Sequence, residues 1–418
     1  MIEPVLYSEH LHEQTTLFYR VRRYIETFAK IWRQSSSEWS EPGQKIGYME
    51  KKRRERHLKT FLRKVRPTRS TQSSFFSESE HENKIFRHVQ QFLVNGISMN
   101  PYQLDLLMSD DFKNSTIEFV TMTRKFDSSL SPADIFQACR NVWIMNGLQL
   151  LLGIKVEFTP AIFAYSLLYP YTDNYLDDIA IPAAEKKSFN KRFEDRLNGL
   201  AVLPKNSHEK IIFALVEMIE GQYNRALYPQ VFESLVAIQQ AQAKSVSLIQ
   251  RIHPLSNKDI LDISLDKGGT SVLADGYLVA GSLTEEQERF LFGYGAYLQL
   301  LDDLQDVQDD AAVGQKTIYS IFSPLIDLDA LANKTFAFGG SVLALYEKST
   351  NEAANAYVDI IQKSVRLMLI EAICFAKEDF SPKYLSILEK QSPFRFKILR
   401  DLKKRHQPYY MSMFGKVI

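Results

Sequence analysis

Apolar residues recur at intervals of three and four along most of this chain, and that spacing constrains its fold more than any other feature. The interval is that of one face of an α-helix. Alternating strand patterns bounded by hairpin turns are missing from the sequence. We therefore predict an all-α fold, an antiparallel helical bundle over about residues 85–418. The longest periodic windows are 211–226, 231–252, 290–307 and 357–376.

Signals for helix starts recur in the same region. Ser131 and Thr159 each stand before a proline, which is the order of a cap residue followed by proline at the first helical position. Thr284 is followed by Gln287 three residues later, as in a capping box. We predict a helix that begins directly after each of these three cap residues.

The first part of the chain differs in composition and is predicted to be a separate unit. Its densest basic stretch begins with Lys51-Lys52-Arg53-Arg54 and continues to Arg66. Such a stretch either contacts an anionic membrane or nucleic acid, or forms a solvated helix face. Residues 67–84 are rich in Ser, Thr and Glu, which is typical of a mobile linker. We therefore divide the chain into a basic N-terminal helical arm with a linker, 1–84, and an all-α catalytic domain, 85–418.

Composition argues against several classes of protein. The net charge is +1, from 51 basic and 50 acidic residues, so the chain as a whole has no electrostatic attraction for nucleic acid. Cys139 and Cys374 lack zinc spacing, and a reducing cytosol is the expected compartment. We expect neither a signal peptide nor a membrane-spanning helix, because the apolar stretches are short and interrupted. The expected location is cytoplasmic, with the basic N-terminal region as the candidate for peripheral membrane contact.

The first of two acidic motifs follows an apolar stretch, residues 161–169. It reads Asp173-Asn174-Tyr175-Leu176-Asp177-Asp178. On a helix, Asp173 and Asp177 share one face with Cβ atoms about 5–6 Å apart, where like charges repel. Carboxylates crowded beside a buried helix need a compensating cation.

The second acidic motif reads Asp302-Asp303-Leu304-Gln305-Asp306 and is followed by Asp309-Asp310. Its members Asp302, Asp306 and Asp310 recur at every fourth residue and would form one stripe along a helix. The preceding stretch, 290–301, is apolar and aromatic. That stretch can lie in the core while the acidic end faces a cavity.

Two such motifs indicate a metal-bound anion, whereas a single acidic cluster is usually a solvated helix end. Ligands that are all oxygen, with no His or Cys, favour a hard cation such as Mg2+, which completes its coordination with water and substrate phosphate. Two acidic helices approach each other only when cations lie between them, and those cations attract an anion. We therefore expect the substrate to carry a diphosphate.

At these residues the chain resembles the class I isoprenoid synthases, which comprise trans-prenyltransferases, squalene/phytoene synthases and class I terpene synthases. The first motif is similar to the D-x-x-x-D of squalene synthases, and its Tyr-Leu-Asp is also similar to bacterial large-terpene synthases. The second motif matches D-D-x-x-D of the prenyltransferases and is similar to an all-carboxylate form of the terpene synthase triad. The likeness covers roughly residues 130–325 and implies a bundle of the isoprenoid synthase type.

The resemblance implies that about three Mg2+ ions hold the diphosphate between the two motifs. It implies four catalytic metal ligands and three supporting ones. The catalytic ligands would be Asp173, Asp177, Asp302 and Asp306, and the supporting ligands Asp178, Asp303 and Asp310.

The resemblance also implies donors to the diphosphate. The segment Asp266-Lys267-Gly268-Gly269-Thr270 is similar to the broken helix before the second motif, where a lysine or threonine meets the substrate. The two glycines either break that helix or form a tight turn. Gln315-Lys316-Thr317 is similar to the basic loop of prenyltransferases. The candidates are Lys267, Thr270, Lys316 and Arg225, with Arg251 as a further arginine, and a solvated position is the alternative for each lysine and arginine.

A carbocation intermediate would need a dry apolar cavity, and aromatic faces stabilise cations. Five tyrosines lie on the expected helices, although for each of them individually ordinary core packing is the favoured explanation. These tyrosines are Tyr165, Tyr169, Tyr175, Tyr294 and Tyr297.

Several functions follow from this reading. The first is Mg2+-dependent cyclisation or elimination of one allylic prenyl diphosphate by a terpene synthase. Head-to-head condensation of two such molecules comes second, and chain elongation third, because the first site lacks D-D-x-x-D. A helical scaffold or a membrane- or RNA-binding protein is the alternative of another class. Enzymes of this superfamily often form homodimers, and the sequence leaves the oligomeric state open.

Overall fold

The described part of the chain consists of helices. The computed structural model describes residues 16–39, 43–64, 79–178, 180–248, 255–323, 325–348 and 350–404. Within those ranges there are sixteen α-helices and no strand, which confirms the all-α prediction. The α-helices are α2 (Leu17–Gln34), α3 (Tyr48–Lys64), α4 (Ser79–Asn95), α5 (Pro101–Leu107), α6 (Asp110–Phe126), α7 (Pro132–Leu151), α8 (Pro160–Asp177), α9 (Ala183–Leu197), α10 (Ser207–Gln222), α11 (Pro229–Ser245), α12 (Asn257–Ala280), α13 (Glu285–Gln305), α14 (Val307–Val313), α15 (Asp329–Leu343), α16 (Glu352–Phe375) and α17 (Pro382–Gln391), and two 3-10 turns are η1 (Val246–Leu248) and η2 (Lys377–Asp379).

The three sequence signals for helix starts are confirmed. The Ser131 hydroxyl accepts from the Asp134 N–H and begins α7, with proline in the first turn. Thr159 caps α8 in the same way, before Pro160. Thr284 and Gln287 form the capping box of α13. Short polar caps therefore determine where the helices that carry the candidate site begin.

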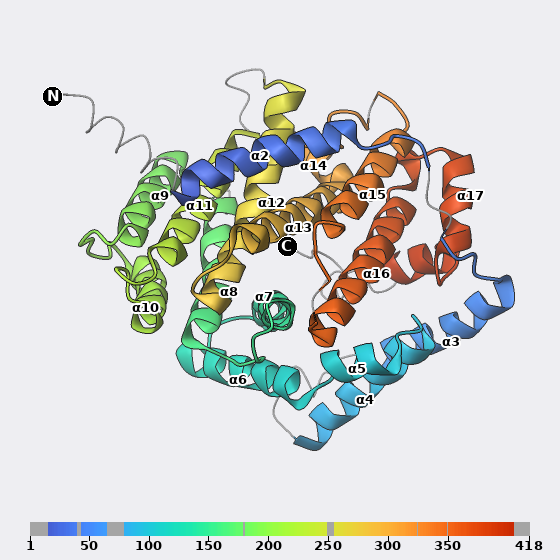
Figure 1. Cartoon of the computed structure of the whole chain (residues 1–418), viewed down its shortest axis with the longest axis horizontal. Coiled ribbons are helices and arrows are strands. Elements are labelled where there is room, and N and C mark those ends of the chain that lie inside the picture. Colours follow the sequence, from blue (N-terminus) through green and yellow to red (C-terminus); the bar gives the residue numbers. More distant parts are fainter. Residues whose placement is uncertain are drawn as a thin grey trace.

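Helix α12 is the centre of the bundle and packs most extensively against α13 and α11 (Figure 1). The contact with α13 depends on two glycines. A Cβ on Gly268 would lie 2.5 Å from the carbonyl oxygen of Gly295, and a Cβ on Gly295 would lie 2.1 Å from the carbonyl oxygen of Gly268. The backbones of the two helices therefore touch at this crossing, which only glycine permits.

The predicted helix break or turn at Gly268-Gly269 is wrong. Helix α12 runs without interruption from Asn257 to Ala280. Glycine weakens a helix by about 1 kcal/mol relative to alanine, but packing can outweigh that cost. Here Gly268 admits the backbone of α13, and Gly269 faces the ring of Phe292. The two glycines therefore serve close packing between helices.

Helix α2 belongs to the hydrophobic core, which the expected division at residues 84 and 85 did not anticipate. Phe28 is fully buried, and its ring centroid lies 5.8 Å from that of Phe292 and 6.3 Å from that of Phe338. Arg20 forms an ion pair with the buried carboxylate of Glu288 at 2.8 Å. Residues of α2 thus contribute to the same core as α13 and α15. The position of a domain boundary stays a prediction.

Helices α3, α4 and α5 lie along one edge of the molecule, away from α9 and α10 (Figure 1). The ring of Phe61 in α3 stacks on Phe92 in α4 with centroids 4.7 Å apart, and Phe92 stacks in turn on Phe394. Helix α4 begins at Ser79. Most of the linker predicted over 67–84 lies outside the described residues. In the ranges that were searched, no helix is long and apolar enough to cross a membrane.

Candidate functional site

The first acidic motif occupies the end of α8. Asp173 and Asp177 both lie in this helix, and Asp178 caps its C-terminus. The half-buried carboxylate of Asp173 accepts a hydrogen bond from Gln242 Nε2 at 2.9 Å. The exposed carboxylate of Asp178 accepts from the Ala180 N–H at 2.8 Å. The side chain of Asp177 lies outside the described part, so its position in a metal site stays a prediction.

The second acidic motif spans the junction of α13 and α14. Asp306 ends the first helix and precedes the second, with φ −98° and ψ 8°. The helical hydrogen bonds continue through this junction, because the Asp306 N–H donates to the Asp302 carbonyl and the Asp310 N–H donates to the Asp306 carbonyl. These three aspartates therefore keep the spacing of one helical stripe. Asp302 and Asp306 are half-buried, and Asp310 is buried.

Asp303 lies on the inner side of α13, and its side chain is only 3% exposed. Its Oδ1 accepts from Gln299 Nε2 at 2.8 Å. Burial raises the pKa of Asp303 to about 6, against the lowering influence of Gln299, Ser264 and the positive charge of Lys267. Asp303 is therefore directed toward α12, and it differs in environment from the other carboxylates of its motif.

The C-terminal end of α11 connects the two motifs. Gln242 contacts Asp173 of the first motif, as described above. Lys244 forms an ion pair with Asp266 of α12 at 3.0 Å. In the following 3-10 turn, the Leu248 carbonyl accepts from the Lys316 N–H at 3.0 Å, and Lys316 lies directly after the second motif. Residues 242–248 thus link the end of α8 with the loop after α14.

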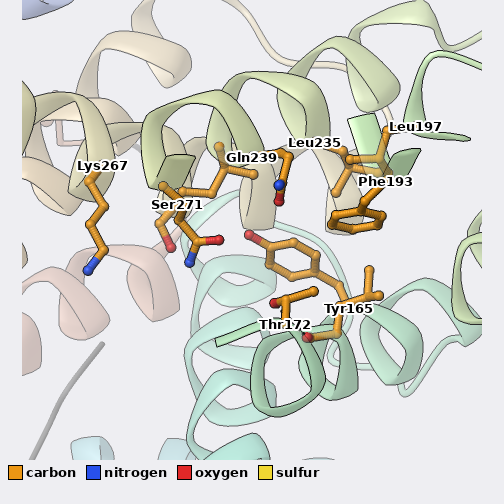
Figure 2. A pocket seen from close by; sticks show the side chains of 11 residues that line it. Tyr165, Thr172, Phe193, Leu197, Leu235, Gln239, Lys267 and Ser271 are labelled. Carbon is orange, nitrogen blue, oxygen red and sulfur yellow. Dashed lines mark hydrogen bonds between the residues drawn. The ribbon is translucent and has the colours of Figure 1, made fainter. Parts of the chain in front are cut away.

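A pocket lies beside this connection, between α8, α9, α11 and α12. Figure 2 shows Lys267 at one end of it, Phe193 and Leu197 at the other, and Tyr165 between them. The pocket therefore has a polar end near the acidic motifs and an apolar end away from them. Its lining consists of Tyr165, Leu168, Thr172, Phe193, Leu197, Leu235, Ile238, Gln239, Gln242, Lys267 and Ser271.

The enclosed space of this pocket measures about 50 Å3. That volume admits a few water molecules. Pockets that hold drug-sized ligands usually measure about 300–1,000 Å3. A hydrocarbon chain therefore enters this pocket only if lining side chains move.

Lys267 connects the pocket with the second motif. It lines the pocket together with Thr172, the residue before Asp173. Its charge also acts on Asp303, as the pKa of that carboxyl shows. Among the described side chains, no group of three or more His, Cys, Asp or Glu is close enough to hold a metal ion. These side chains therefore do not bring three of the predicted metal ligands together, and the ligand role of all seven stays a prediction.

The other candidate donors occupy different environments. Thr270 is buried and its hydroxyl donates to the Asp266 carbonyl at 2.6 Å within α12, so it does not line the pocket. The side chain of Lys316 is half-buried in the loop after α14. Arg225 forms an ion pair with Glu220 at 2.7 Å. It also donates a hydrogen bond to the carbonyl group of Leu197, the last residue of α9. Arg251 lies outside the described residues.

The five candidate tyrosines also occupy different environments. Tyr165 lines the pocket, and its hydroxyl hydrogen-bonds Ser271. Tyr175 stacks on His208 with ring centroids 4.5 Å apart and lies outside the pocket. Tyr294 and Tyr297 are buried in the core. The side chain of Tyr169 is not among those described.

Two further groups at the site were not predicted from the sequence. Gln239 and Gln242 line the pocket from α11, and Lys244 follows on the same helix. The sequence does contain a signal for this group, because Gln239 is a polar residue within an apolar helical window. In the structure its side chain is only 4% exposed. The second group is Asp275, which lies two helical turns beyond Lys267 on the same face of α12.

Asp275 is a buried acid of α12 near the pocket residue Tyr165. Its side chain is 1% exposed and lies near Asn141 of α7. Its Oδ1 has no hydrogen-bond partner within the described ranges. Burial raises the pKa of Asp275 well above its usual value, and its charge would act on Tyr165 and Tyr294. The raised pKa favours the protonated form of this carboxyl in the folded protein.

We expect Asp275→Asn to gain stability relative to the wild type as pH rises. Unfolded aspartate ionises near pH 4, whereas burial raises the pKa of folded Asp275. Between the two pKa values the folded state binds more protons than the unfolded state, so the wild type loses stability as pH rises. The asparagine variant lacks this loss. Urea unfolding of both proteins at about pH 5 and about pH 8 measures the difference. The prediction is wrong if the free energy of unfolding of Asp275→Asn minus that of the wild type stays constant or falls from the lower to the higher pH, and Asp111→Asn on the exposed surface of α6 is the control.

Comparison of the chain with protein-family models, with curated proteins and with solved structures gives no match, so the assignment of function depends on the site itself.

Proposed function

We propose that this chain catalyses the Mg2+-dependent ionisation of an allylic prenyl diphosphate and releases diphosphate, as a class I terpene synthase does. The observation that supports this most is the amphipathic pocket between α8, α9, α11 and α12. Its polar end holds Lys267 and Thr172, beside the first acidic motif, and Lys267 also acts on Asp303 of the second. Its other end is lined by Phe193, Leu197 and Leu235. A substrate with a charged head and a hydrocarbon tail matches this arrangement, with its head at the polar end of the pocket and its tail at the apolar end.

The donor groups around the second motif suit a hard cation. They are carboxylate and amide oxygens, with no thiol or imidazole among the described neighbours named above. Asp303 and Gln299 each have a buried side-chain oxygen for which the described ranges supply no hydrogen-bond partner. Buried oxygens without donors are costly unless a cation or water satisfies them. In this proposal Asp173, Asp177, Asp302 and Asp306 hold Mg2+, with Asp178, Asp303 and Asp310 in support.

Mg2+ held by these carboxylates would supply Lewis-acid stabilisation of the charge that develops on the diphosphate leaving group. Lys267 donates to the diphosphate from the polar end of the pocket, and Lys316 donates from the loop after α14. Gln242 orients the Asp173 carboxylate through its hydrogen bond. These donors are in position before the bond breaks, so that little reorganisation opposes the reaction.

The apolar end of the pocket receives the hydrocarbon tail and excludes water from the cation. Tyr165 presents its ring to this space between the polar and apolar ends. An aromatic face stabilises a nearby cation by about 0.5–2 kcal/mol. Because the enclosed volume is about 50 Å3, the tail displaces lining side chains as it enters. We place that movement at the α9 side, where Phe193 and Leu197 line the pocket.

Product analysis tests the proposal. Purified protein is incubated with Mg2+ and, separately, with farnesyl, geranylgeranyl and geranylfarnesyl diphosphate, with EDTA replacing Mg2+ as the control. We expect inorganic pyrophosphate together with a hydrocarbon or alcohol of the same carbon number as the substrate. A product of doubled carbon number would support head-to-head condensation instead, and elongation only in the presence of isopentenyl diphosphate would support a prenyltransferase. No Mg2+-dependent turnover of any of these substrates would contradict the proposal.

A further inference from the structure

The outward face of α3 carries only basic residues and two apolar ones. Nine residues of this helix are exposed, and none of them is acidic. The first two are Tyr48, 55% exposed, and Met49, 74% exposed. The seven basic residues that follow on this face are Lys52, Arg53, Arg56, His57, Lys59, Arg63 and Lys64.

These residues form two parallel rows. Residues 48, 52, 56, 59 and 63 recur at helical spacing and form the first row, and residues 49, 53, 57 and 64 form the second. Each row therefore begins with an exposed apolar side chain and continues with positive charge. The rows extend over a helix of 17 residues, which is about 25 Å long.

The acidic residues of α3 leave most of this face uncompensated. Glu55 is 3% exposed and forms an ion pair with Arg395 on the inner side, at 2.7 Å. Glu50 pairs with Arg53 of the second row and with Arg54 at the start of the helix. The basic residues of the first row have no acidic residue on their own exposed face. Positive charge is thus concentrated here in a chain whose net charge is only +1.

The inner side of α3 holds the helix firmly in place. Leu58, Phe61 and Leu62 are buried, and the ring of Phe61 stacks on Phe92 of α4. Lys51 is buried as well, and its ammonium group donates to the Glu389 carbonyl of α17. The basic face is therefore presented on a fixed helix. Like charges at this spacing repel one another, and an anionic surface would relieve that repulsion.

We propose that this face of α3, residues 48–64, binds the surface of an anionic lipid bilayer. Each lysine or arginine near such a surface contributes about 1 kcal/mol in general, and the contribution disappears within a Debye length. Tyr48 and Met49 then enter the interfacial region, where amphipathic and apolar side chains are stabilised. Single-stranded nucleic acid is bound by several stacking aromatic rings along a basic groove. The exposed face of α3 has one large aromatic ring, that of Tyr48, in addition to the imidazole of His57, and this favours lipid.

The inference is independent of the proposed enzymatic function and is tested with vesicles. The full chain is sedimented with phosphatidylcholine vesicles that contain or lack phosphatidylserine, at low and high salt. The test variant carries Arg56→Gln, Lys59→Gln, Arg63→Gln and Lys64→Gln. The matched control changes four exposed lysines on other elements, Lys125→Gln, Lys155→Gln, Lys187→Gln and Lys210→Gln.

We expect the wild type and the control to bind vesicles with phosphatidylserine and to be released by salt. The α3 variant should bind at least about tenfold more weakly, and Tyr48→Ser with Met49→Ser should weaken binding at constant charge. Thermal unfolding verifies that every variant is folded. Equal loss in the control, binding independent of phosphatidylserine, no vesicle binding by the wild type, or binding to RNA but not to vesicles would each overturn the proposal.

Discussion

Replacing Asp302 and Asp306 together with asparagine is expected to lower Mg2+-dependent turnover of a prenyl diphosphate by about a thousandfold or more. Asparagine keeps the size of each side chain but removes the charge that holds a divalent cation. Both carboxylates are half-buried at the junction of α13 and α14, where the helical hydrogen bonds come from the backbone. The helix content should therefore be unchanged. Initial rates of pyrophosphate release and far-UV circular dichroism measure the two effects.

Asp309→Asn is the matched control for this experiment. Asp309 belongs to the same acidic segment, but it is exposed and is not among the proposed metal ligands. Its replacement should leave the rate within about twofold of the wild type, since solvated charges contribute little. If the double variant keeps the wild-type rate, or if Asp309→Asn reduces the rate as strongly, the assignment of Asp302 and Asp306 is wrong.

The second large effect is expected at the crossing of α12 and α13. Gly295→Ala should reduce the free energy of unfolding by about 3 kcal/mol, at the upper end of the usual range for overpacking. The new Cβ would lie 2.1 Å from the carbonyl oxygen of Gly268, which belongs to the backbone and cannot rotate away. The helices must then separate, and the packing of Val272 beside them is lost. Denaturant unfolding measures the change.

Gly221→Ala is the control for the same substitution where there is space. Gly221 lies in α10, and no atom lies within 4 Å of the position its Cβ would take. Alanine should stabilise this helix by about 0.5–1 kcal/mol because it restricts the unfolded chain. Equal effects of the two substitutions, or a stable Gly295→Ala variant, would show that α12 and α13 do not touch as described.

The sequence predicted those features of the fold that depend on residues within a single helix, such as where a helix begins. The caps Ser131, Thr159 and Thr284 identified the starts of α7, α8 and α13, and the apolar windows fall on α10, α11, α13 and α16. Gly268 was misread, because its preference depends on Gly295, a residue on another helix. Local sequence reports the cost of a glycine in a helix but not the long-range packing that offsets it.

The contribution of α2 to the core also had a visible signal. Leu17, Val21, Tyr24 and Phe28 are all buried, and they recur at the spacing of one helical face. The basic and aromatic composition of the N-terminal region concealed this pattern. Its division from the rest of the chain was based on composition, which does not report which elements share a core.

The candidate site was predictable in part. The sequence located both acidic motifs, as well as Lys267 and Tyr165, which line the pocket. It did not identify Gln242 or Asp275. The role of a single polar residue in an apolar helix depends on which residues of other helices face it, and the sequence does not show those neighbours. Thr270 was selected because the resemblance implies a lysine or threonine at the substrate, but in the structure its neighbour Ser271 lines the pocket and Thr270 bonds within its own helix.

Our central claim is that the two acidic motifs act as one site for cations and a diphosphate. Calorimetric titration with inorganic pyrophosphate, in the presence and absence of Mg2+, tests it most directly. The titrated proteins are the wild type, Asp173→Asn and Asp302→Asn. We predict binding only with Mg2+ and a loss of at least about tenfold in affinity for each single variant. Binding that does not need Mg2+, or that is unaffected by the loss of either carboxylate, would contradict the claim.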